Sequence, residues 1–295
     1  KRKCDVILTY CWNRVGYTIL RTLSEKGLKV WVADTSSKKY ADILEDEKAR
    51  VEDVIYINGV KGKNYYELHK DDVLELIFNE ELNQEIEINN KTFEKLYEDD
   101  YIMVINKERN ISSQPSRKHP IDNIISCVKK FFLDNNINSN IHLVNRLDFS
   151  TSGLMIIAKD GITHFEFSKI NIVKKYLCEI DGHIIPNEGT INLPIDRYEA
   201  PSIKRFVCET GKPSVTHYKV IKNTENTDFV EATLETGRTH QIRVHFSHLG
   251  HPLIGDELYG KKDEFLKLHC YYLCFNHPWS KKELEFVNYP IWIGR

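Results

Sequence analysis

The sequence lacks the features that mark membrane-spanning, secreted, thiol-redox and zinc-ribbon proteins. It contains no uninterrupted run of about 18 apolar residues, which disfavours a transmembrane helix. Its first apolar stretch is interrupted by Asn13 and Arg14, so no signal-peptide core is predicted. The seven cysteines are scattered and include no C-x-x-C pair. We therefore expect a cytoplasmic protein with no membrane partner.

The sequence also has little net charge. A formal charge of −2 disfavours a protein that coats nucleic acid without specificity, because such binding depends on neutralising phosphates. Basic residues nevertheless cluster, and acidic residues gather elsewhere in the chain. A polarised surface with a local basic groove is predicted. The basic clusters are Lys174/Lys175, Lys204/Arg205, Arg238/Arg243 and Lys261/Lys262.

The opening segment, residues 5–34, reads as strand, helix, strand. Its first turn holds one glycine where the dinucleotide-binding fingerprint needs three, so an α/β unit without a ligand is favoured. The segment resembles the region that precedes ATP-grasp domains. We expect residues 1–90 to form a small α/β region of their own, ending in the acidic stretch between Glu80 and Asn90.

The remainder of the chain, residues 91–295, alternates apolar strands with short helices and turns. This texture predicts an α+β domain built on a mixed, largely antiparallel sheet. The expected strands lie in FEKLYEDDYIMVINK, LMIIAK, KKYLCEIDGHI, VTHYKVIKN and DFVEATLET.

The segment HLVNRLDFSTSGLMIIAKD places Asp148 between Leu147 and Phe149, ahead of an apolar strand. Burial there would disfavour the ionised carboxylate unless a cation lies close by. Asp148 is therefore a candidate nucleophile that needs a basic partner. From this segment alone, an aspartate that caps the amides of a turn is an equal alternative.

The segment LETGRTHQIRVHFSHLGHPLIGDELYG predicts a short amphipathic helix. Thr239 is the expected N-cap, and Ile242, Phe246 and Leu249 form the apolar stripe. Arg238 and Arg243 would then frame one helix end, where an anion is expected. Solvated surface arginines are the alternative.

Tyr176 lies on a predicted strand just after Lys174 and Lys175. An aromatic ring beside cations suits a stacked base next to a backbone phosphate. Read alone, the same pattern fits an ordinary half-buried tyrosine of a strand.

Together these segments make residues 93–295 resemble the RluA family of pseudouridine synthases. Five blocks occur in the family's order, namely VINKERNISSQPS, Arg146 to Gly153, Lys174 to Tyr176, Gly237 to His245 and Gly250 to Gly260. The resemblance implies an isomerase that converts uridine to pseudouridine in a structured RNA without a cofactor. Residues 50–78 also resemble the closing half of the small RNA-binding domain that precedes many such enzymes.

The resemblance assigns roles to individual residues. Asp148 would be the nucleophile, Arg243 its ion-pair partner, Tyr176 the residue that stacks on the target base and Arg146 the residue that fills the gap left by the flipped nucleotide. Further RNA contacts are predicted for Arg238, His240, Gln241, Lys174 and Lys175. Ribosomal RNA is favoured over transfer RNA, and no obligatory protein partner is expected.

The chain departs from the family pattern at two places. Asn145 stands where the family usually has histidine before Arg-Leu-Asp, which would alter contacts with the target strand. The sequence Asn106-Lys107-Glu108-Arg109-Asn110 replaces the usual Asn-Lys-Pro-x-Gly and makes the geometry of this loop an open question.

Three other functions are alternatives to this hypothesis. A metal enzyme would use His240, His245, His248 and His251 with Cys270, Cys274 and His277, but no H-E-x-x-H motif accompanies them. An RNA-binding module that kept the fold and lost turnover is compatible with the altered loop, but the intact Asp148, Tyr176 and Arg243 argue against it. A nucleotide-binding enzyme whose site lies in residues 1–60 would need a second nucleotide-binding motif, and the sequence contains none.

Overall fold

The computed structural model describes residues 6–9, 30–33, 55–57, 60–61, 74–76, 86–137, 139–199 and 202–293. The chain divides into two compact units, residues 1–82 and 83–295. Each is described by itself.

The described part of the first unit consists of short strands. β1 (Val6–Thr9) and β2 (Val30–Ala33) pair in parallel, which confirms the two strands predicted in residues 5–34. The helix predicted between them lies outside the described residues. β3 (Ile55–Ile57) pairs antiparallel with both β4 (Val60–Lys61) and β5 (Leu74–Leu76).

The second unit is built on a ten-stranded sheet. Along it the order is β11-β14-β15-β10-β16-β9-β7-β6, with β17 paired to β16 and β8 to β9. Its strands are β6 (Glu94–Glu98), β7 (Ile102–Lys107), β8 (His142–Leu143), β9 (Ser152–Ala158), β10 (Val173–Asp181), β11 (Glu188–Asn192), β14 (Val215–Asn223), β15 (Thr227–Leu234), β16 (Leu268–Asn276) and β17 (Glu283–Val287). β12 (Ile195–Arg197) and β13 (Arg205–Val207) form a separate hairpin.

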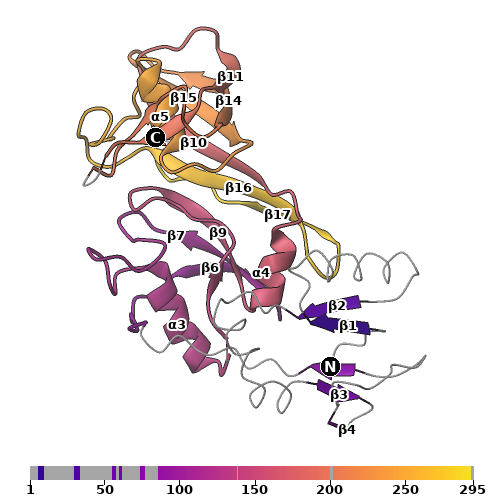
Figure 1. The fold of residues 1–295 in the computed structure, drawn as a ribbon. Helices are drawn as coiled ribbons and strands as arrows, with labels where there is room; N and C mark the ends of the chain where they lie inside the picture. The colour runs from indigo at the N-terminus through magenta and orange to yellow at the C-terminus, as the bar shows by residue number, and fades with distance from the viewer. Residues whose placement is uncertain are drawn as a thin grey trace. The chain divides into compact units, whose positions relative to one another are not determined.

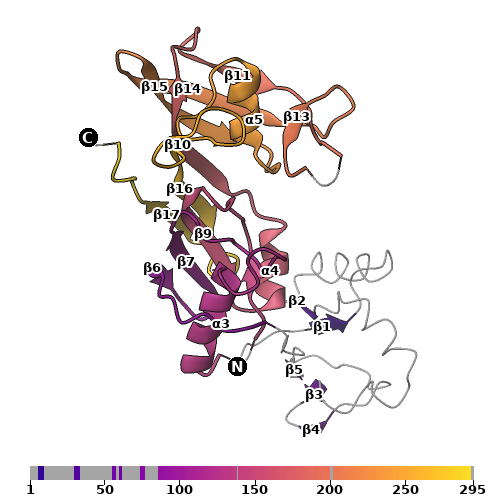
Figure 2. The ribbon, with the colours of Figure 1, turned by 90° about the vertical axis from the view of Figure 1, so that its left-hand side faces the viewer.

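Two antiparallel halves of this sheet meet at one parallel pairing, between β9 and β16. Figures 1 and 2 show the two halves, with β16 running between them. Helix α3 (Ile124–Asp134) and helix α4 (Gly161–Phe167) lie beside the half that contains β6, β7 and β9. Helix α5 (Gln241–His248) lies beside the other half. This mixed sheet with few helices confirms the predicted α+β class.

The core follows from the apolar strands. β7 and β9 are nearly continuous apolar runs, and Ile102, Val104, Met155 and Ile157 are fully buried. Strands with both faces covered lose the alternation of half-exposed strands, because each face packs against other elements. None of the described helices is long and apolar enough to cross a membrane.

A glycine allows β9 and β16 to approach each other. Gly153 pairs with Cys270 and has a φ of 119°, a conformation that side chains rarely adopt. A Cβ at this position would overlap the backbone of Cys270. Beside it the Ser152 hydroxyl lies 2.8 Å from Nδ1 of His269, whose Nε2 donates to the carbonyl of Asn288 at 2.9 Å. Burial lowers the pKa of His269 to about 4, so this histidine is neutral at physiological pH.

Gly153→Ala is expected to destabilise the protein by about 3 kcal/mol or more, because it adds backbone strain and a clash at the junction of the two halves. Gly237→Ala is the matched control, since a Cβ there meets nothing within 4 Å. Its effect should stay within about 0.5 kcal/mol. Thermal or urea unfolding measures both, and equal stability of the two variants would contradict this account of the junction.

Candidate functional site

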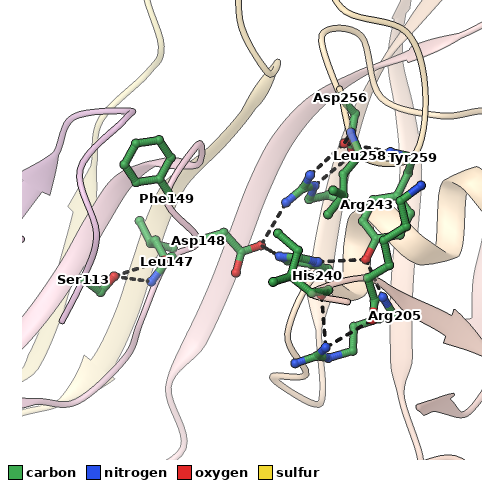
Figure 3. Close-up of polar contacts among 12 residues, drawn as sticks. Ser113, Leu147, Asp148, Phe149, Arg205, His240, Arg243, Asp256, Leu258 and Tyr259 are labelled. Atoms are coloured by element: carbon green, nitrogen blue, oxygen red, sulfur yellow. Dashed lines mark hydrogen bonds and ion pairs between the residues drawn. The ribbon is translucent and has the colours of Figure 1, made fainter. Parts of the chain in front are cut away.

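Asp148 lies in the loop before β9, and both neighbours hold it in place. Leu147 is buried, and its backbone is clamped by Ser113, whose hydroxyl donates to the Leu147 carbonyl at 2.6 Å and accepts from its amide at 3.1 Å. The Asp148 side chain remains 26% exposed. The carboxylate is therefore partly exposed, while the contacts of Ser113 fix the backbone of the residue before it (Figure 3).

The buried side chain of Lys107 is hydrogen-bonded to the backbone of the loop that carries Asp148. It is fully buried, and its ammonium donates to the carbonyls of Glu108 at 2.9 Å, Ile111 at 2.8 Å and Phe149 at 3.3 Å. Burial lowers the pKa of Lys107 to about 7, while the nearby charge of Asp148 acts in the opposite direction. The lysine of the first family block thus ties β7 to the residue that follows Asp148.

The altered loop keeps a tight turn. Asn110, which stands where the family usually has glycine, has a φ of 60°. Asparagine is among the few residues other than glycine that enter this left-handed region readily. The Asn110 amide donates to the Phe149 carbonyl at 2.8 Å, and the Arg109 guanidinium lies 3.5 Å from the centre of the Phe265 ring. The loop is therefore ordered and attached to the Asp148 segment.

Arg243 faces Asp148 from helix α5, but its closer partner is Asp256. The guanidinium donates to the two Asp256 carboxylate oxygens at 2.8 and 2.7 Å, whereas Nη1 lies 3.7 Å from Oδ2 of Asp148. Burial alone would lower the pKa of Arg243, but the hydrogen bonds and charge of Asp256 outweigh it and the pKa is raised. The contacts with Asp256 are thus sufficient to keep Arg243 charged and oriented, without any contribution from Asp148.

Sequence reasoning missed Asp256. It is fully buried and also accepts from the amides of Leu258 and Tyr259 at 3.0 and 3.2 Å. The available signal was the G-D-x-x-Y-G block together with the rule that a buried arginine needs a buried carboxylate.

Helix α5 begins differently from the prediction. Its N-cap is His240 and not Thr239, and His240 has a φ of 59° with no hydrogen bond from its side chain to the helix. Instead Nδ1 of His240 lies 2.8 Å from the Tyr259 hydroxyl, and Nε2 lies 3.8 Å from Oδ2 of Asp148. Burial lowers the pKa of His240, with Asp148 opposing the shift and Arg243 adding to it.

The predicted framing of the helix end by two guanidiniums is wrong. Arg238 is exposed and donates through Nε to the Pro213 carbonyl at 3.2 Å, while Arg243 turns inward to Asp256. Leu249 is 40% exposed, so only Ile242 and Phe246 of the predicted stripe are buried. The helix is too short for the stripe to extend beyond it.

The amide of Gln241 is used within the fold. It donates to the Val215 carbonyl at 2.9 Å and to the Thr216 hydroxyl at 3.0 Å, and it accepts from Thr236 at 2.8 Å and from the Arg238 amide at 3.0 Å. These bonds hold the turn before α5 in place. A direct contact of Gln241 with RNA stays a prediction.

Tyr176 projects from β10 at an irregularity in its pairing with β16. Lys175 pairs with Tyr272 but Tyr176 pairs with Cys270, a register shift of the kind that redirects side chains near active sites. Tyr176 is 7% exposed, and its pKa is raised by burial, then by Cys270 and the charge of Asp148. The phenol therefore lies within the electrostatic reach of Asp148.

The two lysines before Tyr176 differ in environment. Burial lowers the pKa of Lys174. Lys175 instead lies 3.4 Å from a carboxylate oxygen of Glu231 and 5.4 Å from the centre of the Tyr272 ring. Lys175 is thus partly neutralised by Glu231, and RNA contacts for either lysine stay predictions.

Asn145 and Arg146 point to different surroundings. Asn145 is buried, accepts from the Ile156 amide at 2.7 Å and donates to the Leu154 carbonyl at 3.3 Å, so it bonds to β9. Arg146 is exposed and donates to the Gln114 side chain at 3.2 Å. Arg146 is therefore accessible. Asn145, which replaces the histidine usual in the family, instead uses its side chain for hydrogen bonds to the backbone of β9.

The histidines and cysteines of the metal hypothesis are dispersed. Both ring nitrogens of His245 are engaged, by Thr216 at 2.9 Å and by the Leu193 carbonyl at 3.0 Å, and Nδ1 of His251 lies 2.9 Å from the Asp181 carbonyl. Among the described residues, no group of three or more His, Cys, Asp or Glu side chains is placed to hold a metal ion.

Asp256→Asn is expected to destabilise the protein by about 3 kcal/mol, because it leaves the buried Arg243 charge with a weaker partner. Glu257→Gln is the control, since it removes a charge from the next residue, whose exposed carboxylate lies 3.2 Å from Lys262. That change should stay within about 0.5 kcal/mol. Thermal unfolding compares the two, and a tolerated Asp256→Asn change would refute the role given to this pair.

Comparison with known proteins gives one consistent family. The family model described as RNA pseudouridylate synthase matches residues 101–248. The uncharacterized RNA pseudouridine synthase YjbO of Bacillus subtilis is 36% identical over 263 residues, which are 84% of this chain and 93% of that protein. Ribosomal large subunit pseudouridine synthase D of Salmonella typhimurium is 33% identical over 212 residues, 65% of each chain.

A solved structure agrees with these relatives. Human RNA pseudouridylate synthase domain containing 1 has a TM-score of 0.56 and 25% identity, covering 68% of this chain and 85% of that chain. The likeness of residues 5–34 to the region before ATP-grasp domains is not supported by these matches. The shared sequence, the shared fold and the ordered motifs lead to one conclusion: the chain belongs to the RNA pseudouridine synthase family, whose members are isomerases that act on RNA.

Proposed function

We propose that the chain isomerises specific uridines of a structured RNA with Asp148 as nucleophile. The observation that carries the proposal is the setting of this carboxylate. It is partly exposed, and its Oδ2 atom faces a buried arginine at 3.7 Å that Asp256 already holds in position. A nearby cation keeps a carboxylate ionised, and fixed geometry keeps it ready to attack.

The target uridine must leave its stack to reach Asp148, at a cost of a few kcal/mol. Tyr176 would offset about 1–3 kcal/mol of this by stacking on the base. Arg146, which is exposed two residues before Asp148, would occupy the gap left in the RNA. Arg238, Lys174 and Lys175 would contact the surrounding phosphates.

Asp148 would then attack either C1′ of the ribose or C6 of the uracil ring. In both routes the N-glycosidic bond breaks, the uracil turns while it is held in the site, and its C5 bonds to C1′. C5 then loses its proton, N1, which no longer bonds to C1′, gains one, and the bond to Asp148 breaks to restore the carboxylate. No atoms are gained or lost, so the overall change is an isomerisation. The same carboxylate serves both routes.

Ribosomal RNA is the favoured substrate. A relative with 33% identity is named as a large-subunit ribosomal enzyme, which supports this choice over transfer RNA. We further propose that residues 1–90 form an accessory region that helps to bind this RNA, while residues 91–295 carry the reaction.

Asp148→Asn should abolish pseudouridine formation without unfolding the protein. We would map pseudouridines by carbodiimide and primer extension on ribosomal and transfer RNA from cells that carry the wild type, no protein, or the Asn variant. A uridine converted only by the wild type supports the proposal and identifies the RNA. Conversion by the variant would rule out Asp148 as nucleophile, and no differential site with either RNA would favour a binding module without turnover.

Tyr176→Phe should retain RNA affinity within about threefold, because the ring that stacks is kept. Tyr176→Ala should weaken binding by about 1–3 kcal/mol, because the stack is lost. Fluorescence anisotropy on a transcript containing the mapped uridine compares the two. If phenylalanine and alanine weakened binding equally, the stacking assignment would be wrong.

A further inference from the structure

The side chain of His240 is held in a geometry that the role of Asp148 does not by itself explain. The residue has a φ of 59° at the start of a helix, in a left-handed region that few residues other than glycine enter, histidine, asparagine and aspartate being the most frequent of them. It gives no side-chain hydrogen bond to the helix. Its ring instead extends from the Tyr259 hydroxyl on one side to the Asp148 carboxylate on the other (Figure 3).

The hydrogen bonds of the Tyr259 hydroxyl favour one position for the proton of the neutral His240 ring. The backbone amide of Arg205 can only donate, and it lies 2.7 Å from the Tyr259 oxygen, which must therefore accept. In the described part of the chain, the other hydrogen-bond neighbour of this hydroxyl is Nδ1 of His240 at 2.8 Å. Because the Tyr259 oxygen accepts from Arg205, its one hydrogen is available for Nδ1. When the phenol donates there, the proton of the neutral imidazole lies on Nε2, facing Asp148.

We propose that Tyr259 locks His240 in the Nε2–H tautomer and that His240 thereby acts as a positioning residue for Asp148, a role that rests on the proposed function. A neutral N–H donor orients the carboxylate without adding a second full charge beside it. Arg243 and His240 both face Oδ2, at 3.7 and 3.8 Å. Both contacts engage the same carboxylate oxygen, which leaves Oδ1 as the oxygen that would attack in this proposal.

Both distances exceed those of hydrogen bonds, as is common before a substrate tightens a site. The series of hydrogen bonds from His240 through Tyr259 extends beyond the site to Arg205, which is the first residue of β13 in the hairpin with β12.

The charges around His240 determine the pH dependence. They are Asp148 from the loop before β9, Arg243 of α5, Arg205 of β13 and Asp256 from the loop after α5, with the Tyr259 hydroxyl as the remaining titratable neighbour. Burial favours the neutral ring and so lowers the pKa of His240. Below that pKa the ring gains a proton on Nδ1, and Tyr259 loses its acceptor.

The first test needs no substrate. Long-range proton–nitrogen NMR of histidine-labelled protein should show His240, assigned by its loss in His240→Asn, in the Nε2–H tautomer. Tyr259→Phe should give a tautomer mixture and raise the pKa of His240. Asp148→Asn should lower that pKa, whereas Asp134→Asn, on the distant helix α3, should leave it unchanged. An Nδ1–H tautomer, or no change in Tyr259→Phe, overturns the proposal.

The second test is kinetic, on the transcript identified by mapping. Tyr259→Phe should lower kcat about 3- to 10-fold and His240→Asn about 10- to 100-fold, with KM nearly unchanged, the sizes of a neutral and a charge-assisted hydrogen bond. Asparagine is chosen because it tolerates a positive φ. The acid limb of kcat should move to higher pH in Tyr259→Phe. Unchanged kcat in both variants, with Asp148→Asn inactive, overturns this inference alone, whereas an active Asp148→Asn overturns the proposed function.

Discussion

The close backbone approach of β9 and β16 at Gly153 is the constraint on which the rest of the second unit depends. One half of the sheet carries the Asp148 loop, and the other carries α5 and β10. The two halves meet through a parallel pairing of two residue pairs, Ser152 with His269 and Gly153 with Cys270. A Cβ at residue 153 would overlap the Cys270 carbonyl oxygen, so the backbones of the two strands would have to shift apart at the point where the halves meet.

The pairing of β9 with β16 brings the Asp148 loop and helix α5 together, but it does not by itself orient the side chains of Asp148 and Arg243. That task falls to buried polar contacts on each side. Lys107 and Ser113 hold the backbone around Asp148, and Asp256 holds Arg243 through two hydrogen bonds. Groups oriented before the substrate arrives lose little freedom when it binds, which is the physical content of preorganisation.

Much of this arrangement could be predicted from the sequence. The apolar strands gave the sheet and its α+β class, and the ordered motifs placed Asp148, Arg243 and Tyr176 in one site. Asp256 was missed because it lies in an irregular loop, where no periodicity reveals which side chain is buried. Thr239 was wrongly predicted as N-cap because local cap preference ignores the bonds of Gln241, which hold the turn one residue later.

The pairing of Arg243 with Asp256 has a consequence for how enzyme and polymer attract each other. One positive charge is matched by one carboxylate and faces a second, so together these three side chains carry a net negative charge. Such a centre offers no electrostatic attraction to a polyanion, so on the proposed function that attraction would come from cations farther out, such as the exposed Arg146 and Arg238. On the proposed function, recognition and chemistry would rest on different residues, so substitutions at the periphery could change which RNA is selected while the Asp148 site stays the same.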